Sequence, residues 1–338
     1  MARSAAVQAT SNVGERAARR PLPDAVRRRR IREAAIEGVV TLVALTGIAA
    51  VVLIFVFVGR EALPIFTDQE VRAEASLPNM FLPQQLREGR PPEFMWQPVG
   101  DVAKYSMIPL FVGTLKVTLV ALLFAVPIGI AAALYTSEFA PHRVREALKP
   151  AIELLAGVPS VVLGFFGLMV LATWLQDAFG FAYRLNAVVA GIAMALAVVP
   201  VIFTVSEDAL AAVPRSYREA SYALGATPWE TAFKVVLPAA APGVLAAVVL
   251  GFGRSIGETM IVLMASGNAA ITSWSFGESV RTLSATIAAE MGEVVFGDAH
   301  YTVLFFIGVE LFVFTFLLNT VASWSVRRLV RKMTGGSA

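Results

Sequence analysis

The sequence predicts an all-α fold, a polytopic membrane protein with six transmembrane helices. Of its 338 residues, 57% are hydrophobic and 16% are charged, whereas a soluble domain usually carries about 25% charged residues. Six apolar segments are long enough to span a hydrocarbon core about 30 Å thick. Basic residues gather beside these segments and at both ends of the chain, which is typical of membrane topology signals. Cysteine is absent, so disulfides and cysteine-based metal sites are excluded.

Each predicted span is an apolar run bounded by charged or turn-forming residues. Spans two, three and four are expected to contain an internal proline, at Pro127, Pro159 and Pro200. A proline removes one backbone donor, and a membrane helix tolerates this only where neighbouring groups satisfy the freed carbonyl. Three such helices favour a bundle packed around a pathway, although simple packing kinks explain any one of them equally well. The six predicted spans are 38–58, 108–135, 151–175, 187–209, 241–265 and 301–323.

The distribution of lysine and arginine predicts the orientation of these spans. With both termini on one side, the segments on that side carry 19 of the 28 basic residues, and the opposite segments carry 7. The positive-inside rule then places both termini in the cytoplasm. The expected divisions are a disordered basic cytoplasmic tail at 1–37, a first transmembrane helix at 38–58, an outer (periplasmic) loop at 59–107, a core of five transmembrane helices at 108–323 and a basic cytoplasmic tail at 324–338.

The cytoplasmic segment 211–240 is too polar to span a membrane, and its composition predicts two short helices. Gly225 is suited to end the first helix, because it accepts the left-handed backbone conformation. Thr227 is a favourable N-cap for the second, with Pro228 at its first position and Glu230 completing the pattern T-x-x-E. The expected product is a helix–turn–helix on the cytoplasmic surface, called the knuckle below. Two short helices in a cytoplasmic loop can also be purely structural.

The fifth span, 241–265, carries two charges. Pro238 and Pro242 are expected to end the second knuckle helix and to begin this span. Arg254 then lies about 18 Å along a helix that rises 1.5 Å per residue, where a lone arginine costs on the order of 3 kcal/mol. Glu258 is expected one turn further on the same helix face, where it partly neutralises the arginine. This spacing fits a structural ion pair, or an anion site in which the planar guanidinium binds phosphate oxygens.

The knuckle resembles the "EAA" loop of the permease subunits of ABC importers. That family's pattern is E-A-A, three residues, G, nine residues, I, one residue, then L-P, and this sequence differs from it only by serine for alanine and valine for isoleucine. The resemblance implies a type I importer permease fold and a loop, at 215–238, that docks into a groove on a separate ATP-binding subunit. The matching residues are Glu219, Ala220, Ser221, Gly225, Val235, Leu237 and Pro238.

The sequence does not predict an enzyme. It lacks the phosphate-binding motif G-x-x-x-x-G-K-[ST], so we expect no cofactor, and we expect ATP hydrolysis on the separate partner subunit. An intramembrane enzyme using Glu258 is disfavoured, because no nucleophile, metal cluster or second acid stands at a useful spacing. A self-powered secondary transporter is disfavoured as well, since the EAA loop would then have no purpose.

The run Gly253–Met260 (GRSIGETM) resembles the G-R-x-x-G-E-T-M run of bacterial phosphate-importer permeases of the PstC type. The segments Tyr135–Pro141 (YTSEFAP) and Glu153–Val162 (ELLAGVPSVV) resemble that family too. The resemblance implies a bacterial inner-membrane location and an ATP-driven import of inorganic phosphate by alternating access. The implied substrate-path residues are Arg254, Glu258, Ser255 and Thr259.

The same resemblance implies a set of partners. These are a second permease subunit of the PstA type, a dimeric ATP-binding subunit of the PstB type and a periplasmic phosphate-binding protein of the PstS type. A permease for another oxyanion, such as molybdate or sulfate, stays open as an alternative, and so does the PstA-type sister permease. Three further residues receive structural expectations: Lys116 should snorkel to the outer interface, and His142 and His300 should be isolated loop histidines without metal-ligand spacing.

Overall fold

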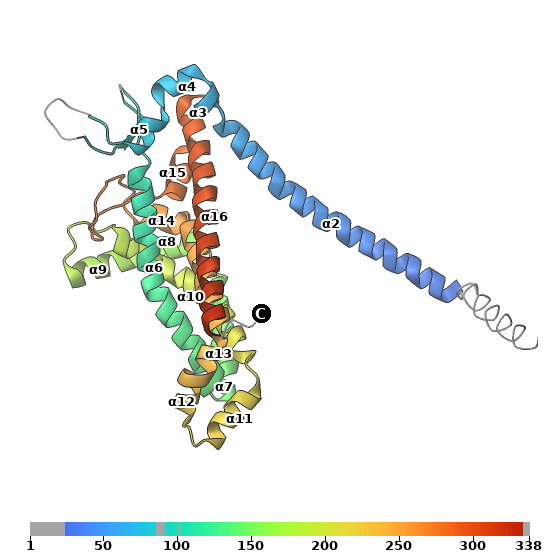
Figure 1. Cartoon of the computed structure of the whole chain (residues 1–338). Helices are drawn as coiled ribbons and strands as arrows, with labels where there is room; N and C mark the ends of the chain where they lie inside the picture. The colour runs from blue at the N-terminus through green and yellow to red at the C-terminus, as the bar shows by residue number, and fades with distance from the viewer. Residues whose placement is uncertain (1–23, 86–91, 101, 334–338) are drawn as a thin grey trace, which may run out of the picture. The chain divides into compact units, whose positions relative to one another are not determined.

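The computed structural model of the chain describes residues 24–85, 92–100 and 102–333. Within these residues, six helices are long and apolar enough to cross a membrane, and most of the ordered structure is helical. The predicted all-α fold with six spans is therefore confirmed. The chain divides into two compact units, Met1–Phe57 and Val58–Ala338, and the ribbon is drawn in Figure 1.

Most of helix α2 (Asp24–Ala62) belongs to the first unit. The helix begins at Asp24, whereas we expected all of 1–37 to be disordered; residues 1–23 lie outside the described residues. Between residues 36 and 57 its large apolar side chains are 51% to 65% exposed, all round the helix. A helix that is apolar on every face is typical of a membrane span, as predicted for 38–58.

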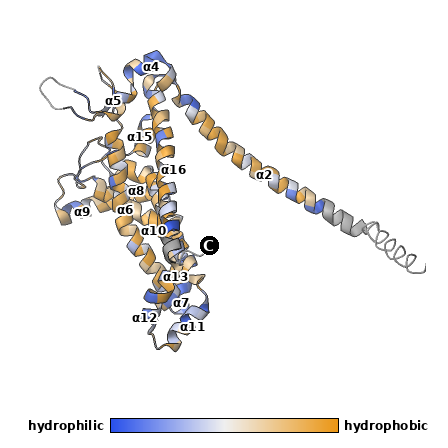
Figure 2. Cartoon of the chain, in the orientation of Figure 1, coloured by the Kyte–Doolittle hydropathy of each residue, from blue (hydrophilic) through white to orange (hydrophobic). Residues whose placement is uncertain are grey.

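Helix α10 (Ala187–Ala211) is central to the packing of the second unit. It packs against α6 (Ile108–Leu134) and α13 (Leu237–Ile256), and apolar residues cover these helices in Figure 2. Small residues bring the backbones close together, as in other membrane bundles. A Cβ added to Gly191 of α10, for example, would lie 2.5 Å from the side chain of Val120 in α6.

The third membrane helix begins later than predicted. The segment before it forms α7, an amphipathic helix without buried residues. Pro159 is the N-cap of the following helix and does not lie inside a span, because proline disfavours the helical conformation in the residue before it. Pro127 and Pro200, in contrast, lie inside α6 and α10 as expected. The elements of this region are α7 (His142–Ala156), α8 (Ser160–Phe166), the π-helix η2 (Gly167–Leu171) and α9 (Ala172–Phe179).

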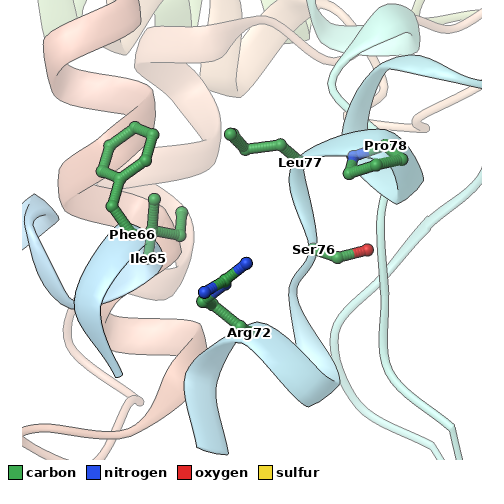
Figure 3. Close-up of a pocket in the computed structure, with 6 residues that line it drawn as sticks. All are labelled: Ile65, Phe66, Arg72, Ser76, Leu77 and Pro78. Atoms are coloured by element: carbon green, nitrogen blue, oxygen red, sulfur yellow. The ribbon is translucent and has the colours of Figure 1, made fainter. Parts of the chain in front are cut away.

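The loop 59–107 is folded in its described residues. Its helices α3, α4 and α5 lie at one end of the second unit, and the knuckle helices lie at the other (Figure 1). A cavity of about 190 Å³ opens between α3, α4 and α5, and Figure 3 shows the Arg72 side chain reaching into it. The elements of the loop are α3 (Pro64–Thr67), α4 (Gln69–Glu74), α5 (Leu77–Phe81), β1 (Trp96–Gln97) and β2 (Lys104–Tyr105), the two strands pairing antiparallel.

A half-buried carboxylate joins three segments of the second unit. Glu290 ends helix α15 (Leu283–Glu290), and it accepts hydrogen bonds from Trp96 Nε1 at 3.1 Å, from His300 Nε2 at 2.9 Å and from Arg281. Burial alone would raise the pKa of Glu290, but the hydrogen bonds from His300 and Trp96 and the charge of Arg281 lower it below its usual value. His300 is therefore not an isolated loop residue, as we expected, but part of this cluster at the start of α16 (Ala299–Met333).

Lys116 does not snorkel to the interface as predicted. Its residue is only 3% exposed, and its ammonium donates to the backbone carbonyls of Ser273, at 3.1 Å, and Ser275. The ring of Phe276 lies 5.8 Å from the same nitrogen. The lysine thus fixes the segment before α15 onto α6, because these carbonyls and this ring help to compensate the burial of its charge.

Candidate coupling surface and intramembrane anion site

The knuckle has the local structure that its sequence predicts. Helix α11 (Arg215–Ala223) ends before Gly225, whose φ of +83° is a left-handed conformation that glycine adopts readily. Helix α12 (Pro228–Thr231) then starts with the expected capping box. The Thr227 side chain accepts from the Glu230 backbone N–H, and the Glu230 side chain accepts from the Thr227 backbone N–H.

The second knuckle helix does not stop at the prolines. It continues through the π-helix η3 (Ala232–Val236) into α13, forming one helical segment over Pro228–Ile256. In η3 the Leu237 backbone N–H donates to the carbonyl of Ala232, five residues earlier. Pro238 falls in the first turn of α13, where its missing N–H is tolerated. The knuckle and the fifth span therefore form one continuous element.

Among the residues of the EAA pattern, Ser221 makes a buried contact, and several of the others are exposed. The Ser221 hydroxyl hydrogen-bonds the Thr231 hydroxyl at 2.9 Å, and both residues are buried, so this pair joins α11 to α12. Glu219 and Ala220 are exposed on α11, Gly225 and Pro238 are exposed, and Val235 and Leu237 are half-buried. Large apolar side chains are also exposed on the knuckle: Tyr217 at 53%, Tyr222 at 47%, Leu224 at 89% and Trp229 at 62%.

Sequence reasoning missed the contact that fixes the knuckle to the bundle. The Arg218 guanidinium of α11 binds the Glu138 carboxylate with both ends of its fork, at 3.0 and 2.6 Å. The hydrogen bonds with Glu138 raise the pKa of Arg218 above its usual value, although burial opposes this. The two residues are 80 positions apart in the sequence, so no local pattern could have indicated that they pair.

The fifth span is broken where the candidate anion site lies. Helix α13 ends at Ile256, residues 257–259 are not helical, and α14 (Met260–Ala265) follows. The predicted continuous helix over 241–265 is therefore wrong, and Glu258 does not sit one helical turn beyond Arg254. Within the described ranges, no ion pair joins these two side chains. Gly257 favours such a break, because glycine loses more backbone entropy in a helix than other residues do.

The structure places the four candidate path residues differently. Arg254 is exposed near the end of α13, while Glu258 and Thr259 are half-buried in the break. One Glu258 carboxylate oxygen accepts from the Thr259 backbone N–H at 3.2 Å, and the Ser284 hydroxyl donates to the Glu258 carbonyl at 2.9 Å. Ser255 is buried, and its hydroxyl donates to a carbonyl of its own helix. The Arg254 side chain is therefore exposed and that of Glu258 partly exposed, whereas the Ser255 hydroxyl is used within the helix.

Helix α16 brings two polar side chains into the membrane that sequence reasoning did not consider. A Cβ on Gly253 would lie 3.2 Å from the Asn319 amide, so Asn319 packs beside the residue before Arg254. Glu310 lies nine residues earlier in α16 and is half-buried. A scan of the sixth span for ionisable residues would have found Glu310, since such residues are rare in membrane helices.

Known proteins similar to this chain identify its family. The family model described as "Binding-protein-dependent transport system inner membrane component" matches residues 125–335. The "Probable ABC transporter permease protein YqgH" of Bacillus subtilis is 37% identical over 284 residues, covering 82% of this chain and 86% of the relative. The "Phosphate transport system permease protein PstC" of Mesorhizobium japonicum is 32% identical over 300 residues, covering 83% and 88%.

A solved structure agrees on the fold. The bacterial alginate ABC transporter, in complex with an alginate pentasaccharide-bound periplasmic protein, contains a chain that superposes with a TM-score of 0.56 at 15% identity, covering 85% of this chain and 94% of that one. The chain belongs to the family of inner-membrane permease components of binding-protein-dependent transport systems. It is a multi-pass transporter subunit of the ABC importer type and not an enzyme.

Proposed function

We propose that the chain is the permease subunit of an ATP-driven importer of inorganic phosphate, and that it forms the translocation path by alternating access. The observation that carries this proposal is Arg254, an arginine within the fifth span that makes no ion pair in the described chain and is followed four residues later by Glu258 in a helix break. An intramembrane charge of this kind marks a substrate path. Relatives named as PstC phosphate permeases support phosphate as the substrate and favour PstC over PstA.

The separation of Arg254 from Glu258 favours phosphate over sulfate and molybdate. A guanidinium donates to the oxygens of any oxyanion, but an ionised carboxylate only accepts hydrogen bonds. At neutral pH phosphate still carries a proton that it can donate to Glu258, whereas sulfate and molybdate carry none. An anion without a proton would offer the Glu258 carboxylate no hydrogen bond and would repel its negative charge. Polar sites reject substrate analogues by this kind of mismatch.

The exposed knuckle supports an ATPase partner. Its apolar side chains stand on a polar cytoplasmic loop, where an exposed apolar patch marks an interaction site. In the proposed assembly the knuckle docks on a dimeric ATP-binding subunit, a second permease subunit completes the path, and a periplasmic binding protein delivers phosphate. Both termini lie in the cytoplasm, in accord with the excess of basic residues there.

The test is a competition assay with the complex reconstituted in vesicles. The labelled anion is phosphate, and unlabelled phosphate, sulfate and molybdate compete with it. We expect only phosphate to compete, and we expect Glu258→Gln to impair uptake and to weaken the preference against sulfate. Glu146→Gln is the matched control, since Glu146 is an exposed carboxylate on α7 with a 68% exposed side chain. Equal competition by sulfate in the wild type would show that the substrate class is wrong.

A further inference from the structure

We infer that Arg218 and Glu138 are a positioning pair that transmits movement of the knuckle to the cytoplasmic end of α6. This inference rests on the proposed function, in which an ATPase partner moves the knuckle. Neither residue touches the substrate or belongs to the EAA pattern. Their role is to make the knuckle and the end of α6 move as one body.

The geometry of Arg218 is that of a clamp. Nε and Nη2 donate to the two Glu138 oxygens at 3.0 and 2.6 Å, Nη1 donates to the Val213 carbonyl at 2.7 Å, and Nη2 also donates to the Leu210 carbonyl at 3.1 Å. All three guanidinium nitrogens are thus engaged. The side chains of Arg218 and Glu138 are only 19% and 7% exposed. A bidentate pair of this kind fixes orientation as well as distance.

Glu138 lies in a segment that is held from several sides. It belongs to the π-helix η1 (Tyr135–Phe139), which directly extends α6. From α7, Arg145 donates to the carbonyls of Thr136, at 2.8 Å, and Ser137, at 2.6 Å. From α12, the Trp229 ring packs 5.8 Å from the ring of Phe139. Both knuckle helices therefore contact η1, α11 through Arg218 and α12 through Trp229.

The clamp supplies a connection that the chain itself does not make. The second knuckle helix continues into α13, and α11 follows α10 after residues 212–214. Helix α6, in contrast, leads through η1 into α7 and is not joined directly to either knuckle helix. Ring packing is not directional and lets surfaces slide, whereas the Arg218–Glu138 fork resists both sliding and rotation. Without the fork, movement of the knuckle should still reach the body of α6 through its packing against α10, but should reach η1, at the end of α6, only weakly.

The experiment measures phosphate uptake and ATP hydrolysis together, with the full complex in vesicles. Arg218→Lys keeps the charge but loses the fork, and Arg143→Lys is the control, an exposed arginine of α7 outside the docking loop, for which the described chain shows no hydrogen bond or ion pair. We expect Arg218→Lys to retain the ATPase partner and hydrolyse ATP, while phosphate moved per ATP falls at least about fivefold, the lower range of allosteric couplings. An unchanged ratio would overturn the inference.

A double-variant cycle separates a pair from two independent residues. If Arg218 and Glu138 act as a unit, Arg218→Gln with Glu138→Gln should uncouple no more than the worse single variant. If the losses of phosphate moved per ATP in the two single variants multiply in the double variant, the pairing is contradicted.

A spectroscopic measurement keeps the inference testable even if the wild type imports no phosphate, a result that would refute the proposed function alone. The chain lacks cysteine, so spin labels can be attached specifically at Arg143→Cys on α7 and Ser216→Cys on α11. With Arg218 present, we expect the distance between the labels to stay constant between ATP-free and ATP-bound complexes. In Arg218→Lys it should become ATP-dependent. An ATP-dependent distance with Arg218 present would contradict the clamp.

Discussion

Substitution of Gly225 tests whether the knuckle turn must be preformed for docking. Gly225 has a φ of +83°, and a Cβ added there would meet no atom within 4 Å. Alanine therefore introduces no clash, and its penalty comes from the backbone alone, about 1–2 kcal/mol for an L-residue in the left-handed region. A penalty of that size disfavours the turn by a factor of roughly 5–30.

The affinity of the solubilised permease for its ATPase partner measures this effect directly. We expect Gly225→Ala to weaken binding by the same roughly 5- to 30-fold, and Gly225→Asn to weaken it less, because asparagine tolerates left-handed geometry. Gly292→Ala is the control, since a Cβ there also meets nothing and the position has no positive φ. The reasoning is refuted if Gly225→Ala binds like the wild type, or if asparagine is worse than alanine.

Three further predictions concern stability, measured as thermal unfolding in detergent. Gly113→Ala should destabilise by at least about 1–3 kcal/mol, because its Cβ would lie 2.1 Å from the Arg281 carbonyl oxygen; wild-type stability would contradict this contact. Lys116→Met should destabilise the protein by about 1–3 kcal/mol in total, because it removes two hydrogen bonds from a charged group to backbone carbonyls, and Lys116→Arg should recover part of that loss; no loss of stability in the methionine variant would contradict a stabilising role of these contacts. Glu290 has a lowered pKa, so its stabilisation is fully present above its ordinary pKa of 4.5 and is lost as the pH falls below that value. The difference in stability between the wild type and Glu290→Gln should therefore be constant near neutral pH and become smaller in acid. A difference that became larger in acid would contradict the lowered pKa of Glu290.

The sequence predicted the features that depend on local chemistry. Apolar runs and basic flanks indicated the six spans, because the bilayer imposes length and composition on each one separately. Gly225 and Thr227 indicated the knuckle turn, because a left-handed glycine and a capping box act within a few residues. Both predictions hold in the structure.

Features that depend on tertiary packing could not be predicted in this way. Pro238 can end one helix or stand in the first turn of the next. The π-helical turn before it makes the helix continuous, so that Pro238 stands in the first turn of α13. The Arg218–Glu138 fork joins distant parts of the chain. The break at Gly257 separates Arg254 from Glu258, although helical spacing had placed them on one face. In the proposed function, this break makes Glu258 an acceptor for the substrate and not a neutralising partner of Arg254.

The most direct test of the central claim is ATP-dependent uptake of labelled phosphate into vesicles that contain the full complex and enclose ATP. Arg254→Gln is compared with Arg143→Gln, the same substitution at an exposed arginine of α7 outside the docking loop. We expect Arg254→Gln to abolish uptake while the subunits stay assembled, and Arg143→Gln to transport normally. Normal phosphate uptake by an assembled Arg254→Gln complex would contradict an anion path at Arg254.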